Sequence, residues 1–154
     1  MPDKVAIIGA GASGLTAARQ AIAYGFEPVI FEKLSDLGGI WRYSENPNVR
    51  SVSWSTTNTS SKELSAFSDF APSEAYSKFM HHTEVLNYLE AYAAHFKLRE
   101  HIKFDTEVTL VARADDWEQT GDWVITYNDK CNACIMKFKH SNKSFIMSTA
   151  LVTL

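Results

Sequence analysis

Three glycines near the start of the chain, Gly9, Gly11 and Gly14, have the spacing G-x-G-x-x-G. Between a strand and a helix, Gly9 permits a tight turn, Gly11 lets a diphosphate approach the backbone, and Gly14 lets the helix lie close to the strands. The N–H groups at the start of that helix would face the phosphates. The spacing therefore predicts a dinucleotide-binding turn, which also includes Ala10, Ala12 and Ser13. The alternative is a glycine-tolerant βα turn without a ligand.

An acidic residue, Glu32, stands eighteen positions after Gly14 and directly follows the β-type run Pro28–Phe31. A carboxylate at this place can accept hydrogen bonds from the ribose of an adenosine group. A 2′-phosphate would meet a like charge there, so the turn is expected to hold FAD or NAD rather than NADPH. The neighbouring Lys33 is included in the predicted cofactor site.

A second pair of glycines, Gly38 and Gly39, is followed by Ile40 and Trp41. A plain NAD-binding unit does not need this pair. The glycines suit a second close approach of backbone to ligand, and Trp41 offers a flat apolar wall for a ring system. The pattern favours FAD over NAD, with Gly39, Ile40 and Trp41 beside the cofactor. The alternative is an ordinary Gly-Gly turn with Trp41 in the core.

A strand, a helix and a second strand must position these residues. Val5–Ile8 and Pro28–Phe31 are the two short apolar runs, and Ser13–Tyr24 between them is rich in Ala and has Gly25 at its end. We therefore predict an α/β fold: a Rossmann-like βαβ FAD-binding unit with an added β-hairpin or meander, within an incomplete doubly wound domain.

Later elements follow from periodicity. Apolar residues recur at helical spacing over Thr83–Phe96, with Thr83 as the expected N-cap. Alternation over Ile102–Leu110 predicts one strand, and Trp123–Tyr127 predicts a second that pairs with it. Two more short strands are expected around Ser141–Ser144. The polar segment Arg42–Ser61 predicts a long, ordered loop.

Other candidate sites are weaker. Cys131 and Cys134 form a lone C-x-x-C with only His140 as a nearby third ligand, so neither a metal site nor a redox centre is predicted. The pair His81–His82 lacks a second histidine at i, i+4 spacing, and a loop or capping role is expected. No metal site is predicted anywhere in the chain.

Composition limits the function classes. With 154 residues, of which 45% are hydrophobic, we expect a single domain over residues 1–154. The net charge of −3 does not favour nucleic acid or an anionic membrane surface. No apolar run approaches the about 20 residues of a membrane span. Two cysteines indicate a reducing compartment, and the glycine spacing argues against a signal peptide.

Several stretches together resemble the amino-terminal part of flavin-containing monooxygenases, in matching order from roughly Val5 to Tyr127. They are KVAIIGAGASGL, VIFEK, LGGIW, NTSSKELSAFSDFAP, YSKFMHH and HFKLREHIKF. The resemblance implies that the first glycine turn binds the FAD diphosphate and that Glu32 binds its ribose. It also implies that Asn58, with Thr59 beside it, lies at the flavin ring and the nicotinamide cofactor as a catalytic residue. The family usually has this asparagine three residues before the lysine, whereas Asn58 is four before Lys62.

The implied activity is NADPH-driven monooxygenation, in which reduced flavin takes up O₂ and passes one oxygen to a soft nitrogen or sulfur nucleophile. The family also implies a cytoplasmic location or the cytosolic face of the endoplasmic reticulum. The sequence departs from the family in three ways: it stops at Leu154, it contains no second G-x-G-x-x-G for NADPH, and residues 131–154 form a divergent tail. We therefore expect this chain alone to be inactive.

Two alternatives remain. Another two-dinucleotide flavoprotein, such as a disulfide reductase, should have a redox cysteine pair soon after the Gly-Gly turn, and Arg42–Ser61 contains no cysteine. The other is a non-catalytic module that binds FAD or NAD, or a remnant that binds neither.

Overall fold

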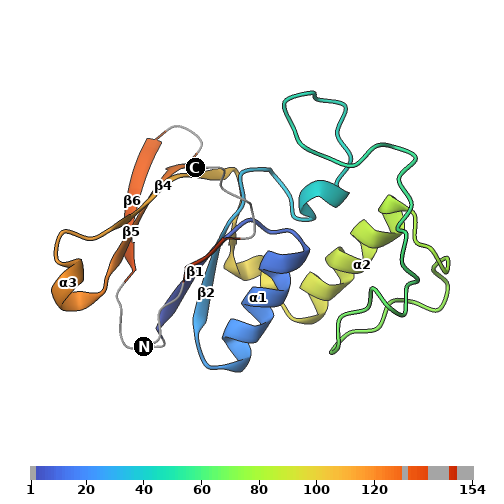
Figure 1. Cartoon of the computed structure of the whole chain (residues 1–154), viewed down its shortest axis with the longest axis horizontal. Helices are drawn as coiled ribbons and strands as arrows, with labels where there is room; N and C mark the ends of the chain where they lie inside the picture. The colour runs from blue at the N-terminus through green and yellow to red at the C-terminus, as the bar shows by residue number, and fades with distance from the viewer. Residues whose placement is uncertain (1–2, 130–131, 139–145, 149–154) are drawn as a thin grey trace.

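The computed structural model describes residues 3–129, 132–138 and 146–148, which form two sheets and two long helices (Figure 1). A parallel sheet has the strand order β3-β2-β1-β7, and an antiparallel sheet has the order β4-β5-β6. The antiparallel sheet lies on one side of β1 and β2, and the helices α1 and α2 lie on the other (Figure 1). The bounds of the strands are β1 Lys4–Ile8, β2 Glu27–Phe31, β3 Ile102–Lys103, β4 Thr106–Arg113, β5 Trp123–Asp129, β6 Asn132–Phe138 and β7 Ile146–Ser148. The helices are α1 Ala12–Ala23, α2 His82–His95 and α3 Trp117–Thr120, with 3₁₀ turns η1 Gly39–Trp41 and η2 Leu98–His101.

The predicted βαβ unit is confirmed. β1 and β2 pair in parallel from Lys4 opposite Glu27 to Ile8 opposite Phe31, and α1 connects them. After the charged first residues Lys4 and Glu27, both strands are apolar because helices and the second sheet cover their two faces. On the helix side, Ile7 of β1 and Leu15 of α1 are fully buried in one core cluster.

α2 begins one residue earlier than expected, and its N-cap is His81 rather than Thr83. The His81 ring accepts a hydrogen bond from the Thr83 N–H, while the Glu84 carboxylate accepts one from the His81 N–H at 3.0 Å. This is a capping box in which an imidazole nitrogen takes the place of the usual hydroxyl. The capping role expected for the histidine pair is therefore confirmed for His81.

The single strand predicted over Ile102–Leu110 is wrong, because the chain bends at Asp105, whose φ is 51°. Residues 102–103 pair with β2 in the parallel sheet, and the chain then enters β4 of the antiparallel sheet. Alternation of apolar and polar residues continues across the bend, so periodicity alone does not reveal it. Aspartate is one of the few residues that tolerate the left-handed region.

The antiparallel sheet confirms the predicted meander. β5 pairs with β4 on one side and with β6 on the other, and it contains the predicted strand Trp123–Tyr127. The sheet packs on the parallel sheet through aromatic rings, with the Phe31 centroid 5.1 Å from Tyr127 and 6.3 Å from Phe138. Of the two strands expected around Ser141–Ser144, one strand is described, β7 at Ile146–Ser148, and residues 139–145 lie outside the described residues. β7, just beyond them, pairs in parallel with β1.

The long segment between η1 and α2 has turns and two isolated bridges, Thr57 to His81 and Phe67 to Phe70. The loop predicted over Arg42–Ser61 is thus confirmed, and the residues that follow it form further turns. The Lys62 ammonium group holds these turns by donating to the backbone carbonyls of Ser73, Glu74 and Tyr76. The segment is ordered by hydrogen bonds rather than by a sheet or a helix.

Candidate functional site

The first glycine turn joins the end of β1 to the start of α1. The Gly9 N–H donates to the Phe31 carbonyl at 2.8 Å, so the turn begins in contact with the end of β2. A Cβ atom on Gly14 would overlap the Gly9 carbonyl oxygen, so only glycine permits this close packing of helix on turn. Gly11 is the N-cap of α1, which directs the first free N–H groups of the helix toward the turn.

The second glycine turn lies directly against the first. The Gly38 N–H donates to the Ala10 carbonyl at 3.0 Å. A Cβ atom on Gly39 would lie only 3.0 Å from the Gly11 Cα, and one on Gly11 would lie 3.6 Å from the Gly39 Cα. Two backbone segments without side chains therefore meet at the N-terminus of α1. Such a place suits an anion that needs backbone contact and a positive helix end.

Glu32 stands at the end of β2 with 4% of its surface exposed. Its Oε2 accepts a hydrogen bond from the Ala10 N–H at 2.7 Å, and its Oε1 accepts one from the Leu34 N–H at 2.9 Å. An ionised carboxylate has roughly four acceptor positions, so two remain for the hydroxyls of a ribose. The neighbouring Lys33 is exposed. Sequence reasoning identified Glu32 but missed its bond to Ala10, for which no local signal exists.

Ile40 and Trp41 follow in η1. Ile40 is 51% exposed, and its carbonyl accepts a hydrogen bond from the Val52 N–H at 2.8 Å. Trp41 is half-buried and packs against the same core cluster as Ile7 and Leu15. Trp41 thus contacts the core, as the second alternative expected, and its role beside a cofactor stays a prediction.

Asn58 and Thr59 lie in the loop rather than in the glycine turns. The Asn58 N–H donates to the Met80 carbonyl at 2.8 Å, and its side-chain amide donates to the Ser65 hydroxyl at 2.9 Å. Thr59 is exposed. Within the part of the chain that the structure describes, no hydrogen bond, ion pair or ring contact joins these two residues to either glycine turn.

An aromatic cluster anchors the loop to the start of α2. The His82 ring is 2% exposed and lies 5.9 Å from the Tyr43 ring and 5.5 Å from the Trp54 ring. The His81 Nε2 is 2.9 Å from the Trp54 carbonyl oxygen. The two aromatic residues of the predicted loop therefore order it, and Trp54 itself stays 64% exposed.

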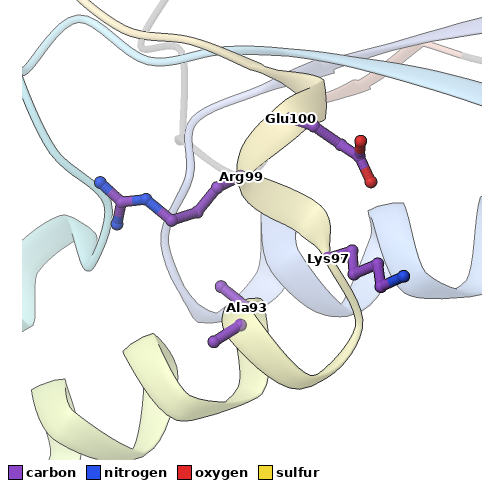
Figure 2. A pocket seen from close by; sticks show the side chains of 5 residues that line it. Ala93, Lys97, Arg99 and Glu100 are labelled. Carbon is purple, nitrogen blue, oxygen red and sulfur yellow. The ribbon is translucent and has the colours of Figure 1, made fainter.

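A cavity of about 340 Å³ lies at the C-terminal end of α2, and none of the predicted site residues line it. Its walls are Ala93, Ala94, Lys97, Arg99 and Glu100 (Figure 2). Figure 2 shows the Arg99 side chain extending away from Lys97 and Glu100, and its guanidinium forms an ion pair with Asp36 at 3.0 Å. The cavity is therefore separate from the glycine turns.

No group of three or more His, Cys, Asp or Glu side chains suited to a metal ion occurs among residues 3–129, 132–138 and 146–148. Cys134 is half-buried in β6, and Cys131 lies outside the described residues. No helix in these ranges is long and apolar enough to cross a membrane.

Comparisons with known proteins match most of the chain. The model of the family described as flavin-binding monooxygenase-like matches residues 2–138. The N-oxide-forming dimethylaniline monooxygenase 4 of Oryctolagus cuniculus is 41% identical over 125 residues, which are 80% of this chain and 22% of that protein. Flavin-containing monooxygenase 2 of Homo sapiens is 39% identical over 127 residues, 81% of this chain and 24% of that protein.

Solved structures agree with this similarity. The S-allyl-L-cysteine S-oxygenase of Allium sativum superposes with a TM-score of 0.79 and 29% identity, covering 90% of this chain and 35% of that one. A steroid monooxygenase bound to NADP superposes with a TM-score of 0.69 and 27% identity, over 85% of this chain and 24% of that one. The α/β, Rossmann-like fold predicted from the sequence is thereby confirmed. The chain spans 22–25% of the length of the curated relatives it matches.

Proposed function

The chain belongs to the flavin-binding monooxygenase-like family, and we propose that it holds the FAD of such a monooxygenase at the two glycine turns. The proposal is carried by one observation: Gly11 and Gly39 approach each other at the N-terminus of α1 with no side chain between them. The family uses FAD and NADPH, and the geometry suits the diphosphate of a dinucleotide.

The role proposed for each residue in binding FAD follows from its position relative to the two glycine turns. The backbone N–H groups at the first turn, from Gly11 to Gly14, hold the diphosphate with the help of the helix dipole. Glu32 accepts hydrogen bonds from the ribose through its remaining lone pairs, with Lys33 at the rim. Ile40 and Trp41 border the flavin ring as an apolar wall. The full set of proposed cofactor-binding residues is Gly9, Ala10, Gly11, Ala12, Ser13, Gly14, Glu32, Lys33, Gly39, Ile40, Trp41, Asn58 and Thr59.

The proposed reaction is NADPH-dependent oxygenation of a soft nitrogen or sulfur nucleophile by a longer, complete enzyme. The bound flavin supplies the oxygen chemistry, and the protein orients the reactants and excludes water. The names of two similar proteins support this substrate class, since one forms an N-oxide and the other is an S-oxygenase. Asn58 is the proposed catalytic residue near the ring.

We further propose that residues 1–154 act as one partial FAD-binding domain, in which residues 131–154 are the part least like the family. Alone, this domain would hold the cofactor without turning over substrate. The complete enzyme would work in the cytoplasm or on the cytosolic face of the endoplasmic reticulum.

The test compares two glycine variants. Gly11→Ala adds a methyl group in ordinary contact with Gly39, so the fold should be retained, but the methyl group would enter the place proposed for the diphosphate. Gly25→Ala adds the same group in open space at the end of α1, where a φ of 83° strains any other residue. After incubation with FAD and desalting, the wild type and Gly25→Ala are expected to keep the flavin absorbance band, and Gly11→Ala to lose it.

Two results would overturn the proposal that FAD binds at the glycine turns. A folded wild-type chain without flavin, or a Gly11→Ala chain that retains flavin like the wild type, would exclude cofactor binding at this turn. Circular dichroism of each protein in the far ultraviolet shows that it is folded.

A further inference from the structure

We propose that Arg42 is a positioning residue for the FAD site: its guanidinium joins the second glycine turn to α2 and so holds Gly39 beside Gly11. This inference deepens the proposed function and rests on it. Arg42 is not one of the residues predicted from the sequence to contact the cofactor.

The Arg42 side chain closes the turn on itself. Its Nε donates to the Leu37 carbonyl at 2.8 Å, five residues back along the chain. Its backbone N–H donates to the Gly39 carbonyl at 3.2 Å. Arg42 thus binds Leu37, which precedes the Gly38–Gly39 pair, and Gly39 itself. These two hydrogen bonds close residues 37–42 into a compact loop.

The same guanidinium also forms ion pairs with two carboxylates. The Arg42 Nη2 atom lies 2.7 Å from Oε1 of Glu90 in α2 and 2.9 Å from Oδ2 of Asp36. The Asp36 Oδ1 atom in turn forms an ion pair with the Arg99 Nη2 of η2 at 3.0 Å and accepts a hydrogen bond from the Leu37 N–H at 2.9 Å. Positive and negative groups alternate along this chain of contacts, which connects the turn to two separate elements.

These bonds are suited to fixing a position. The side chains of Arg42, Asp36 and Glu90 are 29%, 32% and 41% exposed, so the ions are only partly screened by water. Hydrogen bonds between ionised partners are shorter and stronger than neutral ones. A network with several well-directed contacts contributes where an isolated surface pair contributes little.

The turn needs such a restraint because its own backbone is unusually free. Gly38 has a φ of 121° and Gly39 a φ of 56°, and glycine loses more conformational entropy on ordering than any other residue. Among the described residues, one backbone hydrogen bond, from the Gly38 N–H to the Ala10 carbonyl, joins the pair directly to the first turn. The Arg42 contacts restrain the pair from the other side, by joining it to Leu37, Asp36 and Glu90. A cofactor that requires the two turns at a set spacing binds more tightly when this spacing exists beforehand.

The test measures FAD affinity of the full chain by quenching of flavin fluorescence. The variants are Arg42→Gln and Arg42→Lys, with Arg50→Gln as the matched control, since Arg50 is exposed in the same loop and forms no hydrogen bond or ion pair with another described residue. Arg42→Gln is expected to raise the Kd for FAD roughly tenfold, which corresponds to about 1.4 kcal/mol of binding free energy. Arg50→Gln is expected to leave the Kd unchanged.

Two further measurements separate positioning from general stabilisation. Lysine keeps the charge but places all its donors on one nitrogen, whereas Arg42 uses Nε for Leu37 and Nη2 for the two carboxylates, so Arg42→Lys is expected to give an intermediate Kd. The visible circular dichroism of the bound flavin should change in Arg42→Gln, because the wall around the ring has moved. Glu90→Gln, which leaves Arg42 bound to Asp36, should shift the Kd in the same direction by a smaller factor.

The outcomes are distinct. A wild-type Kd and flavin spectrum in Arg42→Gln and Glu90→Gln, with FAD still bound by the wild type, would overturn the inference and leave the proposed function standing. Weaker binding with an unchanged flavin spectrum and no rescue by lysine would assign Arg42 to the fold alone and also overturn it. A wild-type chain that does not bind FAD would overturn both. If Arg42→Gln does not fold, Glu90→Gln alone decides.

Discussion

The backbone N–H of Ala10 donates to the Oε2 atom of Glu32 at 2.7 Å, so the acid after β2 is bound to the glycine turn after β1. The second carboxylate oxygen receives the Leu34 N–H, and the Glu32 carbonyl accepts a hydrogen bond from Thr106 at the start of β4. One residue therefore connects the turn, the end of β2 and the antiparallel sheet. Its proposed contact with a ribose would use lone pairs that these bonds leave free.

Glu32→Gln is expected to destabilise the chain even without cofactor. The amide offers one acceptor oxygen where two backbone donors converge, so either Ala10 or Leu34 faces an N–H group in a site that is 4% exposed. An unpaired buried polar group costs about 1–3 kcal/mol. Urea unfolding measures the change, and Glu45→Gln, on the exposed part of the loop, is the control. Equal unfolding free energies for the two variants would contradict this role.

Gly14→Ala is expected to abolish the native packing of α1. The added methyl group would overlap the Gly9 carbonyl oxygen. The oxygen belongs to the backbone and the methyl carbon is bonded directly to it, so neither atom can move aside as the end of a long side chain can. The expected cost is at least about 3 kcal/mol, at the upper end of overpacking effects. Circular dichroism during thermal unfolding measures it against Gly11→Ala. A Gly14→Ala variant as stable as Gly11→Ala would show that the packing is looser than described.

Tyr88→Phe is expected to loosen the segment that precedes α2. The Tyr88 hydroxyl donates to the Phe70 carbonyl at 2.6 Å and accepts from the Phe67 N–H at 2.8 Å, and the residue is 3% exposed. Loss of both bonds should cost about 1–3 kcal/mol. Tyr24→Phe, at a position 78% exposed, removes the same atom without a bonded partner and should change nothing measurable. Hydrogen exchange at Phe67 would show the local opening, and unchanged protection there would refute it.

Glu84 makes the stability of α2 depend on acid pH. Hydrogen bonds from the Ser77 and His81 backbone N–H groups lower the pKa of Glu84 below its ordinary value of 4.5. A carboxyl group whose pKa is lowered by folding contributes stability above the ordinary pKa, and this contribution disappears as the pH falls through the folded-state value. Unfolding free energies measured from pH 6 to pH 3 should therefore fall less steeply for Glu84→Gln than for the wild type. Glu118→Gln, at an exposed position of α3, should keep the wild-type slope.

The sequence by itself determined the βαβ unit, the first helix with its Gly25 end and the identity of Glu32 as the acid after β2. These features are local: the apolar runs, the turn glycines and the spacing to the acid all lie within one short segment and obey short-range rules. The similarity to flavin-containing monooxygenases rests on the same segment and on the stretch that follows it.

The tertiary structure alone decided which distant groups meet. Arg42 reaches Glu90 across 48 residues, and the close backbone approach of Gly11 and Gly39 joins two separate turns. Such contacts depend on how α2 packs against α1 and η1, and no spacing in the sequence encodes that packing. The bend at Asp105 was hidden for a related reason, since an alternating pattern is the same on either side of a change of sheet. The order of residues in a short segment determines its local structure, whereas the distance between the two glycine turns results from the packing of the whole domain.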